Sequence, residues 1–311
     1  MFTISIVIPV YNSSNIMPSL LMAIENERIK FNWDLELILI DDGSKDNSFE
    51  QIKNLSQKYS YIRGVKLARN FGHQIAVRTG LQFATKNYVA IIDDDLQDPP
   101  CLIQDFIDKM KEGYDVAYGI RKKRKENILK KSSYHLFYRI LNQIANINIP
   151  LDTGDFCVMK RKVVDEMLRF EEKNVYLRGI RAWVGFNQIG IEYERNAREI
   201  GESGYSLKKL FKIAKDGIFS FSNVPLRLIT ISGQIGLLAA IFYTSYVIYL
   251  NLVNNIPVRG FSTITILISF FSSLILICLG IIGEYITRIY DEVRDRPHAI
   301  IETKIGFNET S

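Results

Sequence analysis

The feature that most constrains the fold of this chain is a long apolar stretch close to its C-terminal end. From Leu228 to Gly283 there are 56 residues with one charged side chain, Arg259. A helix needs about 20 apolar residues to cross the hydrocarbon core of a bilayer. The stretch is long enough for two such helices joined by a short polar turn. It therefore predicts a membrane hairpin at 226–285, with helices at about 228–253 and 261–283, in preference to two buried helices of a soluble core.

Basic residues flank this stretch on both sides. They are Lys208, Lys209, Lys212, Lys215 and Arg227 before the first predicted helix, and Arg288, Arg294, Arg296 and Lys304 after the second. Because Lys and Arg concentrate on the cytoplasmic side of membrane helices, both termini are predicted to be cytosolic. The sequence thus predicts a multi-pass protein of the cell inner (cytoplasmic) membrane, with a cytosolic domain at 1–225 and a cytosolic tail at 286–311.

Composition excludes several other classes of protein. Hydrophobic residues make up 47% of the sequence and charged residues 23%, which excludes intrinsic disorder. The three cysteines form no CxxC pair, so neither a structural zinc site nor a disulfide scaffold is supported. The chain also lacks GxGxxG and GxxxxGK[ST] motifs, which argues against a dinucleotide-dependent oxidoreductase and a P-loop enzyme.

A cluster of basic residues accounts for the whole net charge of +5. Seven Lys and Arg side chains lie from Arg121 to Lys131, against the single acid Glu126. One local patch indicates one anionic partner, and it argues against binding to nucleic acid. A solvated loop is the alternative from composition alone. The nearby membrane hairpin favours contact with a phosphate or an anionic lipid.

Apolar, β-branched runs alternate with helical patterns over the first 120 residues. The predicted strands are Ile4–Val10, Leu35–Ile40, Ile62–Leu67, Tyr88–Ile92 and Val116–Tyr118, and the predicted helices are Pro18–Arg28, Phe49–Tyr59, His73–Ala84 and Pro100–Met110. This alternation predicts an α/β fold, with a mostly parallel sheet and helices on both faces. Such sheets bind ligands at the carboxyl ends of their strands.

Polar clusters stand at four of those strand ends. They are Tyr11-Asn12, Asp41–Ser44, Asn70–Gly72 and Asp93–Asp95. The three carboxylates of the last cluster are hard oxygen ligands that suit Mg²⁺ or Mn²⁺, and such an ion could neutralise a diphosphate. An acidic turn that caps the next helix is the alternative, and the same ambiguity holds for 41–46. His73 has no carboxylate at helical spacing, so it is expected to be structural.

Two amphipathic stretches lie between the predicted sheet and the predicted hairpin. Apolar stripes near 131–147 and 205–221 have the period of a helix, and the second carries lysines beside its stripe. Both are predicted to lie at the membrane interface. For the first stripe, packing on the core of the domain is an equally good alternative.

Taken together, the motifs resemble glycosyltransferase family 2, in its branch that acts on polyprenyl phosphates. That branch contains the dolichyl-phosphate mannose synthases and the bactoprenol-phosphate glucosyltransferases. The matching stretches cover nearly the whole chain and are Val7–Asn12, Asp41–Ser44, Arg69–Gly72, Asp93–Pro100, Asp152–Phe156, Arg178-Gly179 with Trp183, Arg198–Ser203 and Asp216–Arg227. Three positions depart from the family pattern, where Glu, Ala and Lys are common and this chain has Ser13, Asp94 and Gly204.

The resemblance implies a GT-A fold and a role for each matching residue. The implied donor-binding residues are Pro9, Tyr11, Asp41, Asp93, Asp94, Gln97 and Arg198. The implied ligands of Mg²⁺ or Mn²⁺ are Asp93, Asp95 and Gln97. The implied ligands of the acceptor phosphate are Arg121 and, as a weaker candidate, Arg124. The implied catalytic residues are Asp95, Asp155 and Arg121, with Asp155 facing the donor sugar.

The resemblance also implies the reaction. It is transfer of a hexose, with inversion, from a nucleotide-diphosphate sugar such as UDP-glucose to undecaprenyl phosphate or another polyprenyl phosphate, giving a lipid-linked sugar for modification of cell-envelope glycans. The alternatives are a degenerate sugar-nucleotide-binding membrane scaffold and a processive polysaccharide synthase, although the Gln-x-x-Arg-Trp motif of the synthases is missing. A homo-oligomer and a separate flippase are both compatible with this function.

Overall fold

The computed structural model describes residues 2–121, 153–173, 175–194, 224–254 and 260–307, and these fall into two compact units. One unit contains a single eight-stranded sheet and includes the chain from Pro297 onwards. The other contains two long helices between 224 and 296. The predicted interfacial helices near 131–147 and 205–221, together with Arg124, Arg198 and Gly204, lie outside the described residues.

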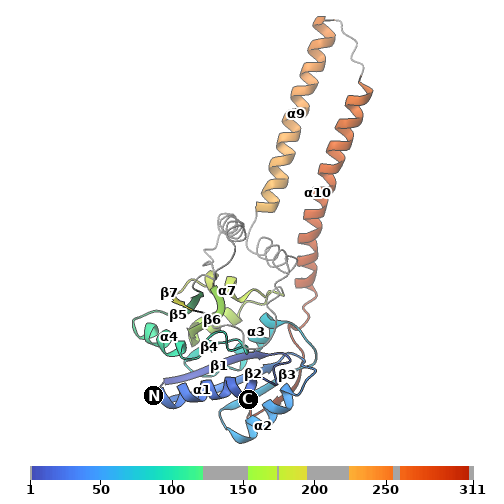
Figure 1. Ribbon diagram of the computed structural model, residues 1–311. Helices are drawn as coiled ribbons and strands as arrows, with labels where there is room; N and C mark the ends of the chain where they lie inside the picture. Colours follow the sequence, from blue (N-terminus) through green and yellow to red (C-terminus); the bar gives the residue numbers. More distant parts are fainter. Residues whose placement is uncertain (1, 122–152, 174, 195–223, 255–259, 308–311) are drawn as a thin grey trace. The chain divides into compact units, whose positions relative to one another are not determined.

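The sheet domain alternates strands and helices, as the sequence predicts (Figure 1). Its elements are β1 (Phe2–Val10), α1 (Met17–Phe31), β2 (Trp33–Asp41), α2 (Ser48–Lys58), β3 (Ile62–Leu67), α3 (His73–Phe83), β4 (Tyr88–Ile91), α4 (Leu102–Lys111), β5 (Val116–Arg121), β6 (Thr153–Lys160), α6 (Arg161–Leu168), α7 (Leu177–Trp183), β7 (Gln188–Tyr193) and β8 (Ile301–Ile305). The order across the sheet is β7-β5-β6-β4-β1-β2-β3-β8. Strands β4, β1, β2 and β3 are parallel, as are β5 and β7, whereas β6 and β8 run antiparallel to their neighbours.

Helices cover both faces of the sheet, and the alternation of side chains along β1 explains why. Ile4, Ile6 and Ile8 point into one apolar cluster, where residues of α1, α2 and α4 pack against them. Val7 points into the opposite cluster, where residues of α3, α6 and α7 pack. Both faces of the central strands are therefore buried, as expected for parallel strands in an α/β domain.

The last strand, β8, comes from the far end of the chain. It pairs with β3 in antiparallel register, from Gly64 opposite Ile305 to Leu67 opposite Ile301. The backbone N–H of Ala68 donates to the carbonyl of Ile300 at 2.9 Å. The sequence pattern of 286–311 predicts no strand. Because β8 is short and half-exposed, its pattern gives little signal by itself.

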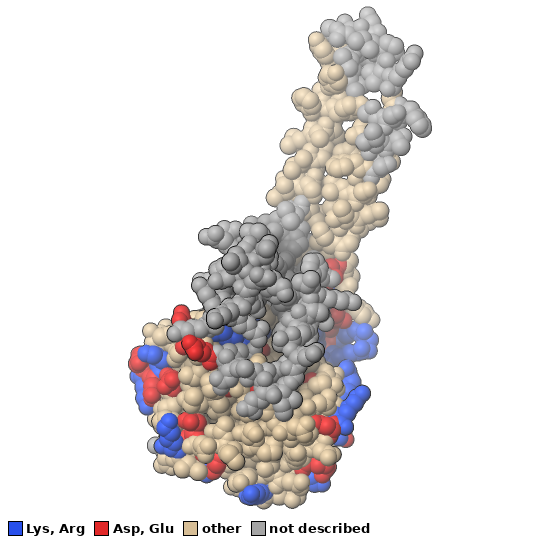
Figure 2. All heavy atoms as spheres, in the orientation of Figure 1, with Lys and Arg blue, Asp and Glu red and all other residues tan. Residues whose placement is uncertain are grey.

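The second unit consists of α9 (Val224–Asn254) and α10 (Phe261–Val293). Gly236 of α9 lies against the ring of Phe271 in α10. From Leu228 to Asn254, α9 contains no charged residue, and Figure 2 shows charged side chains concentrated instead on the sheet domain. Within the described part of the chain one segment, Phe270–Val293, is long and apolar enough to cross a membrane, and Ile229–Tyr243 in α9 is a shorter apolar helix.

Candidate active site

Hydrogen bonds between loops connect the carboxyl ends of β1 and β2. The backbone N–H of Asn12 donates to Ser44 Oγ at 2.9 Å, and the backbone N–H of Lys45 donates to Asn12 Oδ1 at 2.8 Å. Asn12 adopts a left-handed backbone conformation with φ of 54°, which Asn tolerates better than most residues. The two loops thus form one fixed wall of the candidate site.

Asp42 fixes the loop that follows β3. Its two carboxylate oxygens accept the backbone N–H groups of Phe71 at 2.7 Å and Gly72 at 2.9 Å. Gly43 beside it has φ of +68°, and a Cβ there would lie 2.5 Å from the carbonyl carbon of Arg69. Only glycine tolerates both the positive φ and the close approach of the Arg69 backbone. The Asp41–Ser44 cluster is therefore packed against the loop that follows β3 and is not an exposed turn.

Asp41, a predicted donor ligand, is fully buried at the end of β2. Its Oδ1 accepts the backbone N–H of Ser44 at 3.4 Å, and its Oδ2 has no hydrogen-bond partner among the described residues. Burial raises the pKa of this carboxyl. Buried acceptors are normally satisfied, so the free oxygen could accept an N–H of a bound nucleobase. Pro9 and Tyr11, also predicted here, lie at the end of the neighbouring strand, with Pro9 buried and Tyr11 45% exposed.

The acidic cluster after β4 has three carboxylates in three environments. Asp94 Oδ2 accepts the backbone N–H of Tyr11 at 3.4 Å and the hydroxyl of Ser13. Asp95 Oδ1 accepts the backbone N–H of the buried Gln97 at 3.1 Å. Asp93 Oδ1 is buried without a hydrogen-bond partner, and burial raises the pKa of Asp93 to about 6. Ser13 and Asp94, two of the departures from the family pattern, therefore bind each other.

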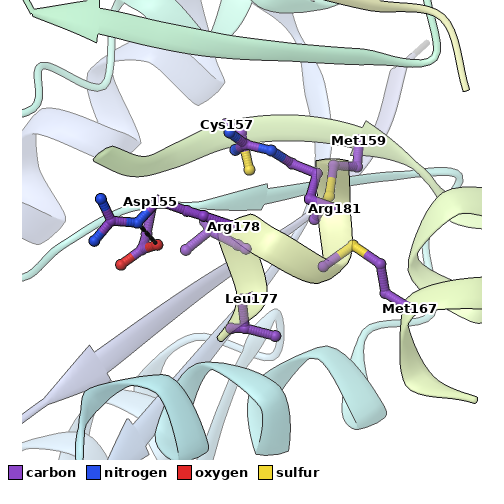
Figure 3. Close-up of a pocket in the computed structure, with 8 residues that line it drawn as sticks. Asp155, Cys157, Met159, Met167, Leu177, Arg178 and Arg181 are labelled. Atoms are coloured by element: carbon purple, nitrogen blue, oxygen red, sulfur yellow. Dashed lines mark ion pairs between the residues drawn. The ribbon is translucent and has the colours of Figure 1, made fainter. Parts of the chain in front are cut away.

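Asp155, on β6, is the most heavily coordinated carboxylate of the site. Its Oδ2 accepts hydrogen bonds from the Gln74 amide at 2.9 Å and from His73 Nε2 at 3.2 Å, and its Oδ1 forms an ion pair with Arg178 Nε at 3.0 Å. Burial by itself would raise the pKa of Asp155, but the charge of Arg178 and the bond from His73 outweigh it and hold that pKa well below its usual range. Figure 3 shows Arg178 reaching from α7 to this carboxylate. Asp155 is therefore a fixed anion.

His73 bridges two of the predicted site residues. Its Nε2 lies 3.2 Å from Asp155 and 3.6 Å from Asp93 Oδ1. Burial lowers the pKa of the imidazole, but the bond to Asp155 and the charge of Asp93 prevail and raise it to about 9. His73 is thus a cation between two carboxylates. Both carboxylate partners are remote from His73 in the sequence, so spacing along its own helix could not reveal them, and its structural role stays a prediction.

Arg121, the predicted ligand of the acceptor phosphate, is the last residue of β5. Its Nη2 lies 3.6 Å from Asp98 Oδ2, and its Nε donates to the hydroxyl of Tyr193 at 3.4 Å. Asp98 belongs to the same loop as Asp93 and Asp95, so Arg121 is tied to the acidic loop.

The acidic loop offers oxygen donors that fit a hard divalent cation. Asp93 and Asp95 are carboxylates, and the buried Oδ1 of Asp93 accepts no hydrogen bond from a described residue, with His73 3.6 Å away. No group of three His, Cys, Asp or Glu residues in the described ranges is arranged to hold a metal alone. A cation here would need further oxygens from water or substrate, which is the usual situation of protein-bound Mg²⁺.

A small cavity lies behind Asp155. It measures about 10 Å³ and is lined by α7 and β6 residues that include Cys157, Leu177 and Arg181 (Figure 3). This volume is the size of one water molecule, so the cavity is too small for a sugar. The substrates would instead occupy the open end of the sheet, where the strand-end loops meet.

Sequence reasoning missed several residues of this site. His73, Gln74 and Tyr193 were not proposed as ligands, and Arg178 appeared only as part of a family motif. His73 and Gln74 begin the helix that follows β3, so their position after a strand end was the available signal. Tyr193 ends β7, and a strand-end rule applied to every strand would have included it.

Comparison with known proteins now identifies the family. A family model described as glycosyl transferase family 2 matches residues 5–168, which is more than half of the chain. This chain belongs to glycosyl transferase family 2. The matched residues contain most of β1, the whole of β2, β3 and β4, both acidic clusters, Arg121 and Asp155. The family match therefore covers much of the candidate site. The chain is a glycosyltransferase with a GT-A type α/β fold.

Relatives match the chain along nearly its whole length. An uncharacterized glycosyltransferase of Bacillus subtilis, YkcC, is 43% identical over 97% of this chain and 94% of its own. A bactoprenol glucosyl transferase of an SfII prophage in Shigella flexneri is 35% identical over 96% and 97%, and an Escherichia coli prophage homologue of that enzyme is 34% identical over 96% and 98%. A glucosyl-3-phosphoglycerate synthase structure from Mycobacterium tuberculosis aligns with a TM-score of 0.46 at 18% identity, over 70% of this chain and 78% of that one. A similarity that low assigns neither donor nor metal.

Proposed function

We propose that this family 2 enzyme transfers glucose from UDP-glucose to undecaprenyl phosphate at the cytosolic face of the membrane. The observation that carries the proposal is Arg121 at the same end of the sheet as the acidic loop, tied to it through Asp98. This places a cation for an acceptor phosphate next to carboxylates suited to a donor diphosphate and its metal. Relatives named bactoprenol glucosyl transferase, aligned along almost the whole chain, support this choice of acceptor and sugar.

The donor would bind at the ends of β1, β2 and β4. Asp41 offers an unsatisfied oxygen to an N–H of the nucleobase, next to Pro9 and Tyr11. Asp155, held by hydrogen bonds from His73 and Gln74 and by an ion pair with Arg178, would accept hydrogen bonds from hydroxyls of the sugar. Arg198 is proposed to contact the diphosphate and Arg124 to assist at the acceptor phosphate.

The reaction needs little acid–base chemistry. The acceptor phosphate is already an anion at neutral pH, so one of its oxygens can attack the anomeric carbon directly, with inversion. That carbon forms a bond to the lipid phosphate as its bond to the nucleoside diphosphate breaks. Arg121 would orient the nucleophile, and catalysis would rest on positioning and electrostatic stabilisation.

Asp93 and Asp95 would hold a divalent cation, Mg²⁺ or Mn²⁺, with Gln97 beside them. When bound, such an ion supplies positive charge that stabilises the departing diphosphate. The buried Oδ1 of Asp93, which accepts no hydrogen bond from a described residue and lies 3.6 Å from His73, would be one ligand of the ion.

The membrane hairpin is proposed from the topology of the chain. Strand β8 follows α10, yet it pairs with β3 of the same sheet that precedes α9. A single crossing would leave β3 and β8 on opposite sides of the membrane, so the number of crossings must be even. The segment Phe270–Val293 is by itself long and apolar enough to cross a membrane. Helix α9 has 31 residues and is about 46 Å long at 1.5 Å per residue. Large apolar side chains such as Phe242 and Leu276 are exposed on both helices, as lipid contact requires.

The proposal is tested by a direct transfer assay. Purified full-length protein in detergent is incubated with undecaprenyl phosphate, Mg²⁺ or Mn²⁺, and UDP-glucose, UDP-N-acetylglucosamine or GDP-mannose carrying a radiolabel. Label from UDP-glucose should enter the organic phase. Asp95→Asn should abolish this transfer while the protein stays folded in detergent. If folded wild-type protein transfers no label from any donor, the binding-scaffold alternative replaces the enzymatic proposal.

A further inference from the structure

We propose that Tyr193, anchored by Asp98, is a positioning residue that aims Arg121 at the acceptor phosphate. This inference rests on the proposed role of Arg121. Tyr193 belongs to no family motif quoted above and would not touch the substrate itself.

The sheet brings the three residues together. In the parallel pair of β5 and β7, Arg121 and Tyr193 are register partners, so both side chains project from adjacent strands on one face. Asp98 approaches from the loop after β4 and is buried, with 1% of its side chain exposed. The hydroxyl of Tyr193 donates to Asp98 Oδ1, and Arg121 Nε donates to the same hydroxyl oxygen at 3.4 Å.

These bonds fix the direction of each group. A phenol hydroxyl has one proton to donate, and Tyr193 donates it to Asp98. The hydroxyl oxygen can therefore only accept the hydrogen bond from Arg121. Burial and the charge of Asp98 raise the pKa of this phenol, so it stays protonated. The guanidinium of Arg121 is held at Nε by Tyr193 and at Nη2 by Asp98, 3.6 Å away, while 32% of its side chain remains exposed. The other terminal nitrogen, Nη1, contacts neither of these two residues, so it is the one available to a phosphate.

Two glycines make room for this arrangement. A Cβ on Gly154 would lie 2.6 Å from Arg121 Nη2, and a Cβ on Gly119 would lie 2.6 Å from the ring of Tyr193. The ring also packs edge-on against Phe156, with centroids 5.8 Å apart. Space, ring packing and hydrogen bonds thus select one orientation of the arginine, which is what a preorganised phosphate ligand requires.

The test is Tyr193→Phe, which keeps the ring and deletes the hydroxyl. Because one hydrogen bond is lost, we expect the KM for undecaprenyl phosphate to rise about two- to tenfold. The KM for the nucleotide sugar should stay within about twofold, since only the acceptor side is perturbed. A merely structural role for the hydroxyl would instead lower the melting temperature and alter both KM values together.

Tyr61→Phe is a matched control. Its hydroxyl also donates to a carboxylate, Glu25, at 2.6 Å, and an arginine, Arg28, lies over its ring. Tyr61 directly precedes β3, and Glu25 and Arg28 lie in α1. All three are away from the strand-end loops of the site. Tyr61→Phe should leave both KM values unchanged. This result would show that the effect of Tyr193→Phe comes from its place beside Arg121 and not from the loss of any tyrosine–carboxylate hydrogen bond.

Gly154→Ala provides a second route to the same arginine. The added methyl group meets the flexible end of Arg121, so the guanidinium should shift without a large loss of stability. It should reproduce the acceptor-specific rise in KM. If both Tyr193→Phe and Gly154→Ala match the wild type in a protein that transfers sugar to the lipid, the positioning role is wrong. If the wild type does not use lipid phosphate at all, the proposed function fails first, and the two failures are distinguishable.

Discussion

At the scale of single residues, His73 has the most unusual electrostatic environment of the site. It contacts Asp155 and faces Asp93, and these carboxylates raise its pKa to about 9. Without them an imidazole titrates near pH 6.5. The imidazolium thus balances part of the negative charge of the site at neutral pH, before any substrate arrives.

This environment predicts a pH-dependent contribution to stability. The native state holds the His73 proton more tightly than the unfolded chain, so its contribution is fully present below about pH 6.5 and is lost as the pH rises through about 9. In EDTA-treated protein, NMR titration should give His73 a pKa near 9, and Asp155→Asn should lower it. The unfolding free energies of wild type and His73→Gln should converge above that pH. An unshifted titration in the wild type would contradict the assignment.

The pairing of residues is what sequence alone could not supply. The triple carboxylate was recognised by type and by position after a strand, whereas Arg121 was noted as part of a basic cluster and took its role from the family resemblance. The bond between Ser13 and Asp94 joins residues 81 positions apart, and each had been noted only as a separate departure from the family pattern. Whether burial raises the pKa of a carboxyl, as in Asp93, or cationic partners lower it, as in Asp155, depends on contacts between residues remote in the sequence.

At the scale of elements, the turn after β2 holds a loop of the proposed donor site in place, and it can do so only with a glycine at position 43. Gly43→Ala would place an alanine in a left-handed backbone conformation, and its Cβ would clash with the backbone of Arg69. The conformation alone costs about 1–2 kcal/mol. The clash should also displace the loop that Asp42 holds through Phe71 and Gly72. We therefore expect a lower melting temperature and a higher KM for the nucleotide sugar.

Gly113→Ala is the matched control for this prediction. Gly113 also has positive φ, at +106°, but a Cβ there would meet nothing within 4 Å. It should lower the melting temperature through backbone strain and leave the KM for the donor unchanged. Equal effects of the two substitutions on that KM would show that the turn does not position the donor loop.

The elements of the parallel sheet were predictable because each carries a strong local signal. Predicted Ile62–Leu67 is β3, with the same first and last residues, and the other strands and helices up to β5 differ by a few residues at their ends. Strand β8 could not be predicted in this way. Its five residues have only two half-buried side chains, and its place is determined by β3, more than 230 residues earlier.

At the scale of the whole molecule, the sheet domain is built from two parts of the chain, because β8 follows the two long helices and the other strands precede them. Glu302 of β8 pairs with Lys66 of β3 at 3.0 Å, and Phe307 packs on Phe83 of α3 at 5.0 Å between ring centroids. The even number of membrane crossings proposed above depends on this pairing. A test of β8 is therefore also a test of the topology.

Ile305→Asp is the substitution that tests it. The Ile305 side chain fills the space above Gly64, and replacing it with a charge should cost about 2 kcal/mol or more. For a domain of this size that lowers the melting temperature by about 4–8 °C. Loss of β8 would also free Ala68 from Ile300, next to the loop held by Asp42, so the KM for the donor should rise. Thr303→Asp places the same charge at an exposed position of the same strand and should change neither quantity. If the two variants behave alike, β8 does not complete the sheet in solution, and the topological argument for two crossings loses its basis.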